Sequence, residues 1–390
     1  MTGKTKSEEE SGLCKERLAY LKSVIEDDIE KQRYYGAAIA VARHGKAGLH
    51  ETIGYADAER KRPLANDSVF SLFSTTKALT NTLVFRAIEL GQFSLTTKVS
   101  EIIPEFSGGI RENITYYHLL THSSGLPSVW IPKPDMYIDV LEEIIQAICE
   151  RIHSTEKPGI RVDYSPLVHH ALMGESVRRT DPKKRSYREL VEDEILRPLG
   201  MNSTAIGVRA DLKERHIVPT FLGDSPTQHL GHSNLGPNGA FEEENAEMPW
   251  VGAVSTIDDM FRFAEMLRRG GELDGARILS PTLLKRARQN QTGQKANELH
   301  KALALNSGWE PFPAYIGIGF SLRGDAYCHT QFGTLTSPET FGNYGHGSSL
   351  YWIDPELDMT FVFLSAGVMR PKDNVERFQR LSDLAVATAI

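Results

Sequence analysis

The sequence predicts a mixed α/β (α+β) fold, in which the two ends of the chain assemble one sheet and a helical lobe is inserted between them. Three observations carry this prediction. Apolar segments typical of strands cluster near both ends, and the middle of the chain shows helical periodicity broken by Pro and Gly. The length of 390 residues exceeds one simple core and suffices for two lobes. We expect residues 1–75 and 305–390 to form the mixed α/β lobe, and residues 76–304 the mainly helical lobe with its long loops.

The individual elements follow from periodicity and turn residues. Near the N-terminus we expect an amphipathic helix over about 12–33, a buried strand over Gly36–Arg43, a turn at 44–46 and a returning strand over 48–55. In the middle we expect helices over 142–152, 167–179 and 186–196, followed by a long polar loop over 223–249. Towards the C-terminus we expect strands over 316–322, 349–353 and 359–364 and a last helix over about 374–388.

Bulk properties exclude several classes of protein. A net charge of −7 argues against nucleic acid as a main partner, and no apolar segment approaches membrane-spanning length. The charged residues 1–10 lack the apolar core of a signal peptide. Three widely spaced cysteines form no metal or disulfide pattern: Cys14, Cys149 and Cys328. We therefore expect a cytoplasmic protein, and the sequence carries no signal for its oligomeric state.

Metal binding was weighed at His118 and His122, which have the i, i+4 spacing of zinc ligands on a helix. The sequence offers no third ligand beside them, so we expect no metal site. No other motif in the chain calls for a cofactor. A G-x-S-x-G segment is also absent from the sequence, which leaves the nucleophile elbow of α/β-hydrolases unsupported.

The segment 73–80 holds the most informative motif. It places Ser74 at the start of a predicted helix and Lys77 three positions later, so the two side chains share one helix face. A serine hydroxyl becomes a usable nucleophile when a neighbouring amine accepts its proton. The helix N-terminus adds unpaired N–H groups that suit a developing oxyanion. The spacing predicts a nucleophilic pair, with a simple helix cap at Ser74 as the alternative.

A second Ser-x-x-Lys match occurs at Ser154 and Lys157. It runs directly into Pro158 and Gly159, which signal a turn. A turn cannot supply the helical register that brings a serine and a lysine three residues apart onto one face. We therefore expect no catalytic pair at this second match.

Tyr164 is the next candidate, because it stands just ahead of a predicted helix and can project its phenol into a cleft. A nearby ammonium group lowers the pKa of a phenol, since positive charge favours the phenolate. We expect Tyr164 to relay protons between Ser74 and a leaving group. The alternative is a tyrosine that only packs on the helical lobe.

A Gly-rich segment over 341–350 precedes an apolar strand. Glycines allow a backbone to come close to a ligand, and an edge strand there offers an N–H group to an oxyanion. The alternative is a plain glycine turn before a strand.

Taken in order, Ser74 with Lys77, Tyr164 after Pro-Gly, and the Gly-rich segment resemble the serine β-lactamase and penicillin-binding-protein superfamily. The resemblance is greatest to the class C β-lactamase-like esterases, also called family VIII carboxylesterases. Three further segments are similar to family motifs: 118–126 to LLTHTSGL, 196–201 to PLGM, and 252–256 to GG-x-x-ST with Val251 in place of the first glycine. The resemblance covers about residues 30–370. It implies a β-lactamase/transpeptidase-like fold, an antiparallel sheet flanked by helices plus a helical lobe, with the active site between the lobes.

Two departures from the family pattern bear on the substrate. The family's Y-x-N motif has Pro166 in the Asn place here, which removes a side-chain contact to a lactam amide and favours esters. The family's late motif, usually K-T-G or H-G-G, has no identical counterpart in this sequence. Counting back from Asp354 without gaps places residues 343–345 at the position of that motif, whereas a three-residue shift places residues 346–348 at that position.

The resemblance implies a role for each site residue. Ser74 is the nucleophile, Lys77 and Tyr164 share the general-base and general-acid work, and the amides of Ser74 and His346 hold the oxyanion. The residues expected to bind substrate are Asn343, Tyr344, Gly345 and Gly347. The predicted function is hydrolysis of a small-molecule ester or amide through an acyl-enzyme, without a cofactor. The alternatives are an acyltransferase or peptidase on the same site, and an inactive binding protein that keeps the fold.

Overall fold

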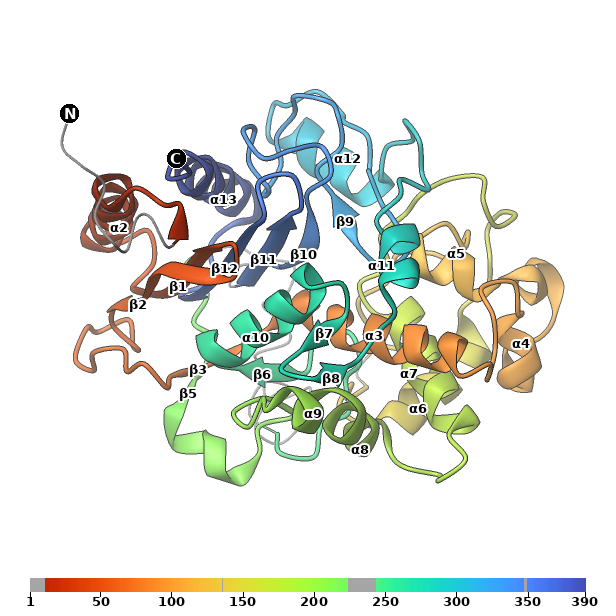
Figure 1. The fold of residues 1–390 in the computed structure, drawn as a ribbon. Helices are drawn as coiled ribbons and strands as arrows, with labels where there is room; N and C mark the ends of the chain where they lie inside the picture. The colour runs from red at the N-terminus through yellow and green to blue at the C-terminus, as the bar shows by residue number, and fades with distance from the viewer. Residues whose placement is uncertain (1–10, 135, 224–242, 347–348) are drawn as a thin grey trace.

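The computed structural model describes residues 11–134, 136–223, 243–346 and 349–390 (Figure 1). Among these residues, the largest sheet has six strands in the order β2-β1-β12-β11-β10-β9, and every neighbouring pair is antiparallel. The strands are β1 (Gly36–Arg43), β2 (Lys46–Gly54), β9 (Ser321–Leu322), β10 (Phe341–Gly345), β11 (Ser349–Asp354) and β12 (Met359–Ala366). Strands from both ends of the chain therefore share one sheet, which confirms the predicted fold class.

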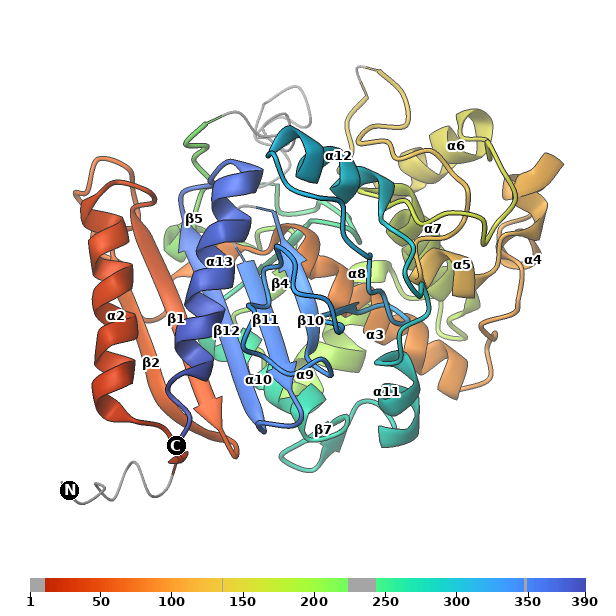
Figure 2. The ribbon, with the colours of Figure 1, turned by 90° about the horizontal axis from the view of Figure 1, so that it is seen from above.

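Side chains alternate between the two faces of this sheet, and each face has its own core. In β1, Ile39 and Val41 belong to the core beneath α2 (Lys15–Glu30) and α13 (Pro371–Val386). Figure 2 shows these two helices on the same face of the sheet. Ala38 and Ala40 point to the opposite core, which continues into the helices of the middle of the chain. The two ends of the described chain meet beside these helices, where the Cys14 N–H donates to the Thr388 carbonyl at 2.8 Å.

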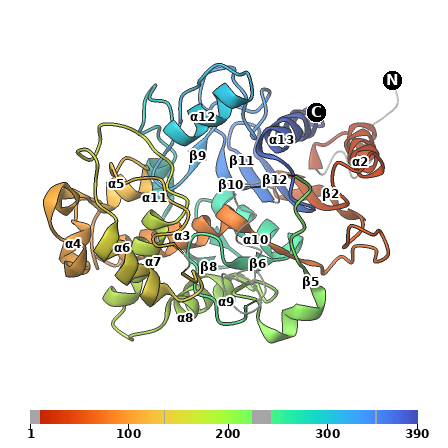
Figure 3. The ribbon, with the colours of Figure 1, turned by 180° about the vertical axis from the view of Figure 1, so that it is seen from behind.

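The helical part is arranged around α3 (Thr76–Glu89), which lies in the centre of the molecule (Figure 3). Its residues from Thr76 to Phe85 are all buried, as expected for a helix that is enclosed on every side. The remaining helices are α4 (Val99–Ile102), α5 (Tyr116–Leu120), α6 (Leu141–Arg151), α7 (Val168–Thr180), α8 (Tyr187–Val191), α9 (Arg197–Leu199), α10 (Ile257–Arg268), α11 (Pro281–Ala287) and α12 (Glu298–Asn306). None of the described helices combines the length and hydrophobicity that a membrane crossing requires.

A small second sheet supports the start of α3. Its order is β4-β6-β3-β5, with strands β3 (Val69–Ser71), β4 (Ala205–Ile206), β5 (His216–Ile217) and β6 (Ala253–Ser255); a separate hairpin pairs β7 (Glu272–Leu273) with β8 (Ala276–Arg277). The Leu72 N–H donates to the Ala253 carbonyl at 2.8 Å, and the Thr76 hydroxyl accepts from the Ala253 N–H at 3.0 Å. Strand β6 therefore holds both sides of the connection between β3 and α3.

Two sequence predictions about local structure were wrong. The expected strand over 316–322 is reduced to Ser321–Leu322, because the chain turns at Gly319, whose φ is +75°. The Gly319 carbonyl accepts from the Asn81 side chain on α3 at 2.7 Å, a contact that no local pattern reveals. The expected helix over 186–196 is interrupted, since α8 is followed by a π-helical turn at Glu192–Leu196. Most of the predicted loop over 223–249 lies outside the described residues.

Candidate active site

Ser74 lies in a short 3-10 turn, Phe73–Thr75, which connects β3 to α3. Phe73 has a φ of +50°, a left-handed conformation that bulky residues rarely adopt and that is typical of functional sites. The turn leaves Ser74 partly exposed while Phe73 and Thr75 are buried. The predicted helix therefore begins two residues after Ser74, and the serine is the reachable residue of this turn.

Lys77 lies in the first turn of α3, and its amine contacts Ser74. The Nζ atom is 3.0 Å from Ser74 Oγ, 2.9 Å from the Pro166 carbonyl oxygen and 3.0 Å from the Trp250 carbonyl oxygen. A neutral amine has two N–H donors and one lone pair. The two carbonyls occupy the two N–H groups, so the lone pair is left to face the Ser74 hydroxyl. Pro166, which cannot offer an amide side chain, thus contributes through its backbone.

The Lys77 amine is strongly desolvated. Its side chain is 3% exposed, and burial lowers its pKa well below the ordinary value of a lysine. Burial has this effect because a charged ammonium loses its hydration in the protein interior. A lysine with a depressed pKa is neutral in a larger fraction of molecules, and the neutral amine is the form that accepts a proton from serine.

Tyr164 reaches the same serine from the irregular segment before α7. Its ring centre lies 5.2 Å from Lys77 Nζ. Burial raises the pKa of the Tyr164 hydroxyl, and its interaction with the Ser74 side chain offsets this only in part. The predicted lowering of this pKa by an ammonium was therefore wrong for the resting site. The physical reason is that burial penalises the charged phenolate of Tyr164 itself, while the neighbouring Lys77 is also buried and favours its neutral form.

The backbone of Tyr164 is held by two distant segments. Its N–H donates to the Asn297 side chain at 3.2 Å, and its carbonyl accepts from the Ser128 hydroxyl at 2.7 Å. Asn297 also caps α12, because the same oxygen accepts from the Leu299 N–H at 3.1 Å. Helix α12 is thereby fixed to the Tyr164 segment, and its His300 ring stacks on Tyr164 with the centroids 5.9 Å apart.

Strand β10 ends against the Ser74 turn. A Cβ atom at Gly345 would lie 2.3 Å from the Leu72 carbonyl oxygen, so only glycine fits this close approach. Ser349, at the start of β11, fixes the contact: its hydroxyl donates to the Leu72 carbonyl at 2.6 Å and lies 2.9 Å from the Thr75 hydroxyl. The end of β10 is therefore held beside the nucleophile turn.

The other predicted residues of the Gly-rich segment lie in different surroundings. Asn343 faces the helical side, where its amide nitrogen is 3.4 Å from the Gly319 carbonyl oxygen. The Tyr344 side chain lies on the opposite face, because its hydroxyl accepts from Asn374 of α13 at 2.7 Å. Tyr344 can therefore reach a substrate only through its backbone. His346 directly follows β10, and burial lowers its pKa to about 4. Gly347 lies outside the described residues.

Sequence reasoning assigned no role at Tyr164 to the histidines that surround it. The rings of His122 and His300 both stack on the phenol, and His169 and His170 lie behind His122. Burial lowers the pKa of His300 to about 4, so its imidazole is neutral at neutral pH. The signal that was available is the segment 118–126, which was recognised by resemblance but was given no function.

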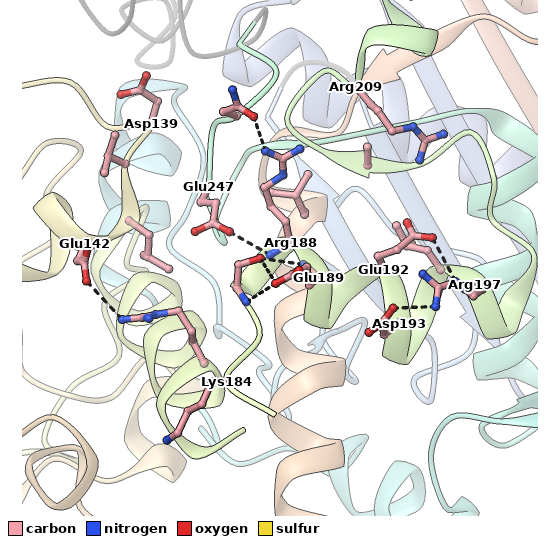
Figure 4. Close-up of a pocket in the computed structure, with 18 residues that line it drawn as sticks. Asp139, Glu142, Lys184, Arg188, Glu189, Glu192, Asp193, Arg197, Arg209 and Glu247 are labelled. Atoms are coloured by element: carbon pink, nitrogen blue, oxygen red, sulfur yellow. Dashed lines mark hydrogen bonds and ion pairs between the residues drawn. The ribbon is translucent and has the colours of Figure 1, made fainter. Parts of the chain in front are cut away.

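The chain also has a large pocket that holds none of the predicted site residues (Figure 4). It has a volume of about 1000 Å³ and lies over α8 and the following π-helical turn. Its walls carry charges of both signs that pair with one another, for example Arg197 with Asp193 at 2.8 Å and Arg178 with Glu142 at 3.7 Å. Its lining serine, Ser186, caps α8 by accepting from the Glu189 N–H at 3.2 Å, so this pocket is not the centre of acyl chemistry.

Comparisons with known proteins agree with this geometry. A family model described as Beta-lactamase matches residues 21–385. Esterase EstB of Burkholderia gladioli is 28% identical over 364 residues, a match that covers 86% of this chain and 84% of EstB. Protein flp of Staphylococcus aureus (strain MW2) is 29% identical over 222 residues, which are 55% of this chain and 43% of flp, so the match spans less than half of that relative.

A solved structure shows the same fold. EstCE1, described as a hydrolase with promiscuous acyltransferase activity, superposes with a TM-score of 0.77 over 95% of this chain and 99% of its own. The two sequences are 20% identical, so this likeness establishes the architecture alone.

Proposed function

The chain belongs to the Beta-lactamase family, and we propose that it is a serine hydrolase that cleaves small-molecule esters through an acyl-enzyme on Ser74. The family match and the similarity to esterase EstB confirm the resemblance predicted from the motifs. One observation carries the proposed chemistry: Lys77 Nζ lies 3.0 Å from Ser74 Oγ and within 3.0 Å of the carbonyl oxygens of Pro166 and Trp250, which can accept the two N–H groups of the neutral amine.

In the acylation step, the Ser74 oxygen attacks the carbonyl carbon of the ester while the Lys77 amine takes the hydroxyl proton. The amides of Ser74 and His346 are assigned to stabilise the oxyanion of the tetrahedral intermediate. Collapse of this intermediate breaks the bond to the leaving oxygen, which takes the proton of the Tyr164 hydroxyl. Lys77 then returns its proton to the Tyr164 phenolate, and both groups are neutral again.

In the deacylation step, water attacks the acyl-Ser74 ester by the same route. The Lys77 amine accepts a proton from the water, and the second tetrahedral intermediate collapses with release of the acid. The proton of the Tyr164 hydroxyl passes to the departing Ser74 oxygen, and Lys77 reprotonates Tyr164. The raised pKa of Tyr164 supports this order, because the phenol starts protonated and acts first as an acid.

The charges of the site favour esters without a carboxylate near the scissile bond. Lys77 has a depressed pKa, and His300 and His346 are neutral at neutral pH. In the gap-free register of the late motif, Asn343 supplies an uncharged amide at the position of the family's lysine. An anionic substrate would find no fixed cation on these four side chains to replace its hydration. A neutral acyl ester fits this site better than an acidic lactam.

Acyl transfer on the same site is a second candidate. The acyl-enzyme reacts with any nucleophile that reaches it, and EstCE1 is described as a hydrolase with promiscuous acyltransferase activity. Adding an alcohol and measuring the ratio of new ester to free acid separates transfer from hydrolysis. A ratio that follows the alcohol concentration would support transfer.

We also infer a cytoplasmic location. The structure leaves the three cysteines as free thiols: Cys14, Cys149 and Cys328. Free thiols suit a reducing compartment.

The two Ser-x-x-Lys segments provide a matched test. We expect Ser74→Ala to lower kcat/KM for p-nitrophenyl acetate and butyrate by about a thousandfold or more, because the nucleophile is removed. Ser154→Ala is the control, because Ser154 lies outside any helix. The activity of this variant should equal that of the native protein. Equal turnover by native protein and Ser74→Ala would overturn the proposed function, provided that circular dichroism shows the same fold.

A further inference from the structure

The imidazole of His122 lies directly against Tyr164, although the acyl-enzyme chemistry proposed above does not use it. The two rings stack with their centroids 4.8 Å apart and their planes 29° apart. His122 is 8% exposed, so this contact is enclosed by protein. Stacking of this kind restricts how far the phenol ring can tilt or rotate.

The same residue also holds the backbone on both sides of Tyr164. The His122 carbonyl accepts from the Asp163 N–H at 2.9 Å, and His122 Nδ1 accepts from the Ser165 N–H at 3.0 Å. His122 therefore contacts three successive residues, 163, 164 and 165. Because Nδ1 is an acceptor, the neutral imidazole carries its proton on Nε2.

His122 itself is placed by a strained and well-fastened turn. It follows α5 with a φ of +53°, a left-handed conformation that is rare for a histidine. The residues after it pair with the segment before Tyr164: the Ser123 carbonyl accepts from the Gly159 N–H at 2.7 Å, and the Gly125 carbonyl from the Thr155 N–H at 3.0 Å. The turn and the Tyr164 segment thus form one unit.

A second imidazole supports His122 from behind. The ring of His169, on α7, stacks on His122 with the centroids 5.1 Å apart. His169 is fixed in turn, because its Nε2 lies 2.6 Å from the Ser124 hydroxyl. A strained backbone that neighbouring residues hold in place is typical of an active site whose side chains are already positioned before substrate binds.

We propose that His122 is a positioning residue for Tyr164, which it aims at Ser74 by holding the phenol ring and both flanking amides. Tyr164 needs such a support because its own segment is neither helix nor strand. The inference rests on the proposed function only in that it assigns the Tyr164 hydroxyl a role in proton transfer. Displacement of a catalytic group by about 1 Å can cost on the order of a hundredfold in rate.

Two substitutions separate the parts of this contact. His122→Ala removes the ring and the Nδ1 acceptor. His122→Asn removes the ring but keeps an acceptor oxygen close to the Nδ1 position, and asparagine tolerates the left-handed backbone. We expect His122→Ala to lower kcat for p-nitrophenyl butyrate by about ten- to hundredfold with little change in KM. His122→Asn should recover part of the loss.

The decisive measurement repeats both substitutions in the Tyr164→Phe background. Phenylalanine keeps the stacking surface but has no hydroxyl to aim, so we expect either substitution to lower kcat there by less than twofold. Residues that act as one unit show this non-additivity. The same fold loss in both backgrounds, or no loss in the native background, would overturn the proposal. His118→Ala is the matched control, since His118 lies in the same segment and pairs with Thr115 instead, and it should leave kcat unchanged.

A second readout does not depend on activity. Hydrogen exchange of the amide at 165, whose acceptor is the His122 side chain, should be faster in His122→Ala and native-like in His118→Ala. Unchanged exchange at this amide would also contradict the positioning role. If native protein and Ser74→Ala turn the ester over equally, the proposed function fails while the exchange result still decides whether His122 holds the Tyr164 segment.

Discussion

Ser74 and Lys77 stand three residues apart on one continuous segment, whereas Tyr164 reaches them from an irregular loop between α6 and α7. The first pair is held by the geometry of a turn and a helix. Tyr164 is held by side chains from three other segments, His122, Ser128 and Asn297. The Ser74–Lys77 half of the site is therefore encoded locally, whereas the Tyr164 half depends on contacts between distant parts of the chain.

The electrostatics of the two halves differ as well. Burial moves the pKa of Lys77 down and that of Tyr164 up, so both groups favour their neutral forms. A neutral amine is ready to accept a proton and a neutral phenol is ready to donate one. The resting site therefore supplies a base and an acid without a buried charge.

The largest expected effect comes from removing either proton-transfer group. We expect Lys77→Ala and Tyr164→Phe each to lower kcat/KM by about a thousandfold, and the double variant to lose far less than the product of the two losses. Measuring kcat/KM of the two single variants and of the double variant with one aryl ester gives the coupling free energy between Lys77 and Tyr164. Mild and multiplicative losses would mean that Tyr164 only packs against the site.

The next effect concerns pH. Below its lowered pKa, Lys77 is protonated and cannot accept the Ser74 proton; above it, the amine is neutral and active. We therefore expect kcat/KM to rise by about tenfold per pH unit on the acid side and then to reach a plateau. The profile of Tyr164→Phe is the control, because the rising limb should persist there. If the rise of kcat/KM with pH disappears in Tyr164→Phe, the group that titrates is Tyr164 and not Lys77.

A smaller effect is expected in substrate preference. Pro166 offers no amide side chain, and an unpaired polar group on a buried lactam costs roughly 1–3 kcal/mol, about ten- to hundredfold in rate. We expect kcat/KM for a short aryl ester to exceed that for nitrocefin, and Pro166→Asn to raise lactam turnover relative to ester turnover. Equal turnover of both substrates by the native protein would remove the argument from Pro166. The Pro166 carbonyl that binds Lys77 stays present in this variant.

The smallest effect is expected from one distant contact of Tyr164. Asn297→Ala removes the acceptor of the Tyr164 N–H and the cap of α12, which lowers the free energy of unfolding by about 1 kcal/mol. We expect a several-fold loss of kcat together with a lower Tm. Ser280→Ala provides the comparison, because it removes the cap of α11 without touching Tyr164. A loss of kcat in Ser280→Ala of the same size would attribute the effect to stability alone.

The local half of the site was predictable because a three-residue spacing is enough to define a shared face. The role of Tyr164 came from the order of motifs. The sign of its pKa shift was predicted wrongly, because the burial of Tyr164 that raises the pKa is a tertiary property. The turn at Gly319, fixed by Asn81, and the fit of Gly345 against the Leu72 carbonyl are likewise set by residues far away in sequence.

The fold, too, could be predicted from the sequence only where local patterns define it. The apolar segment Gly36–Arg43 and the apolar segments over 349–353 and 359–364 predicted strands of one sheet, and these strands are present. The supports of Tyr164 were not predicted, because a histidine in a turn gives no sign of its partner. His122 was considered only as a metal ligand on the strength of its spacing from His118. Its stacking on Tyr164 depends on pairing between residues 121–125 and 155–165, which periodicity does not reveal.

The most direct test of the central claim is mass spectrometry of the protein after brief exposure to a p-nitrophenyl ester, followed by peptide mapping. We expect one acyl adduct, located on Ser74, that appears in native protein and is absent from Ser74→Ala. Turnover with an adduct on another residue, or an adduct that persists in Ser74→Ala, would contradict it.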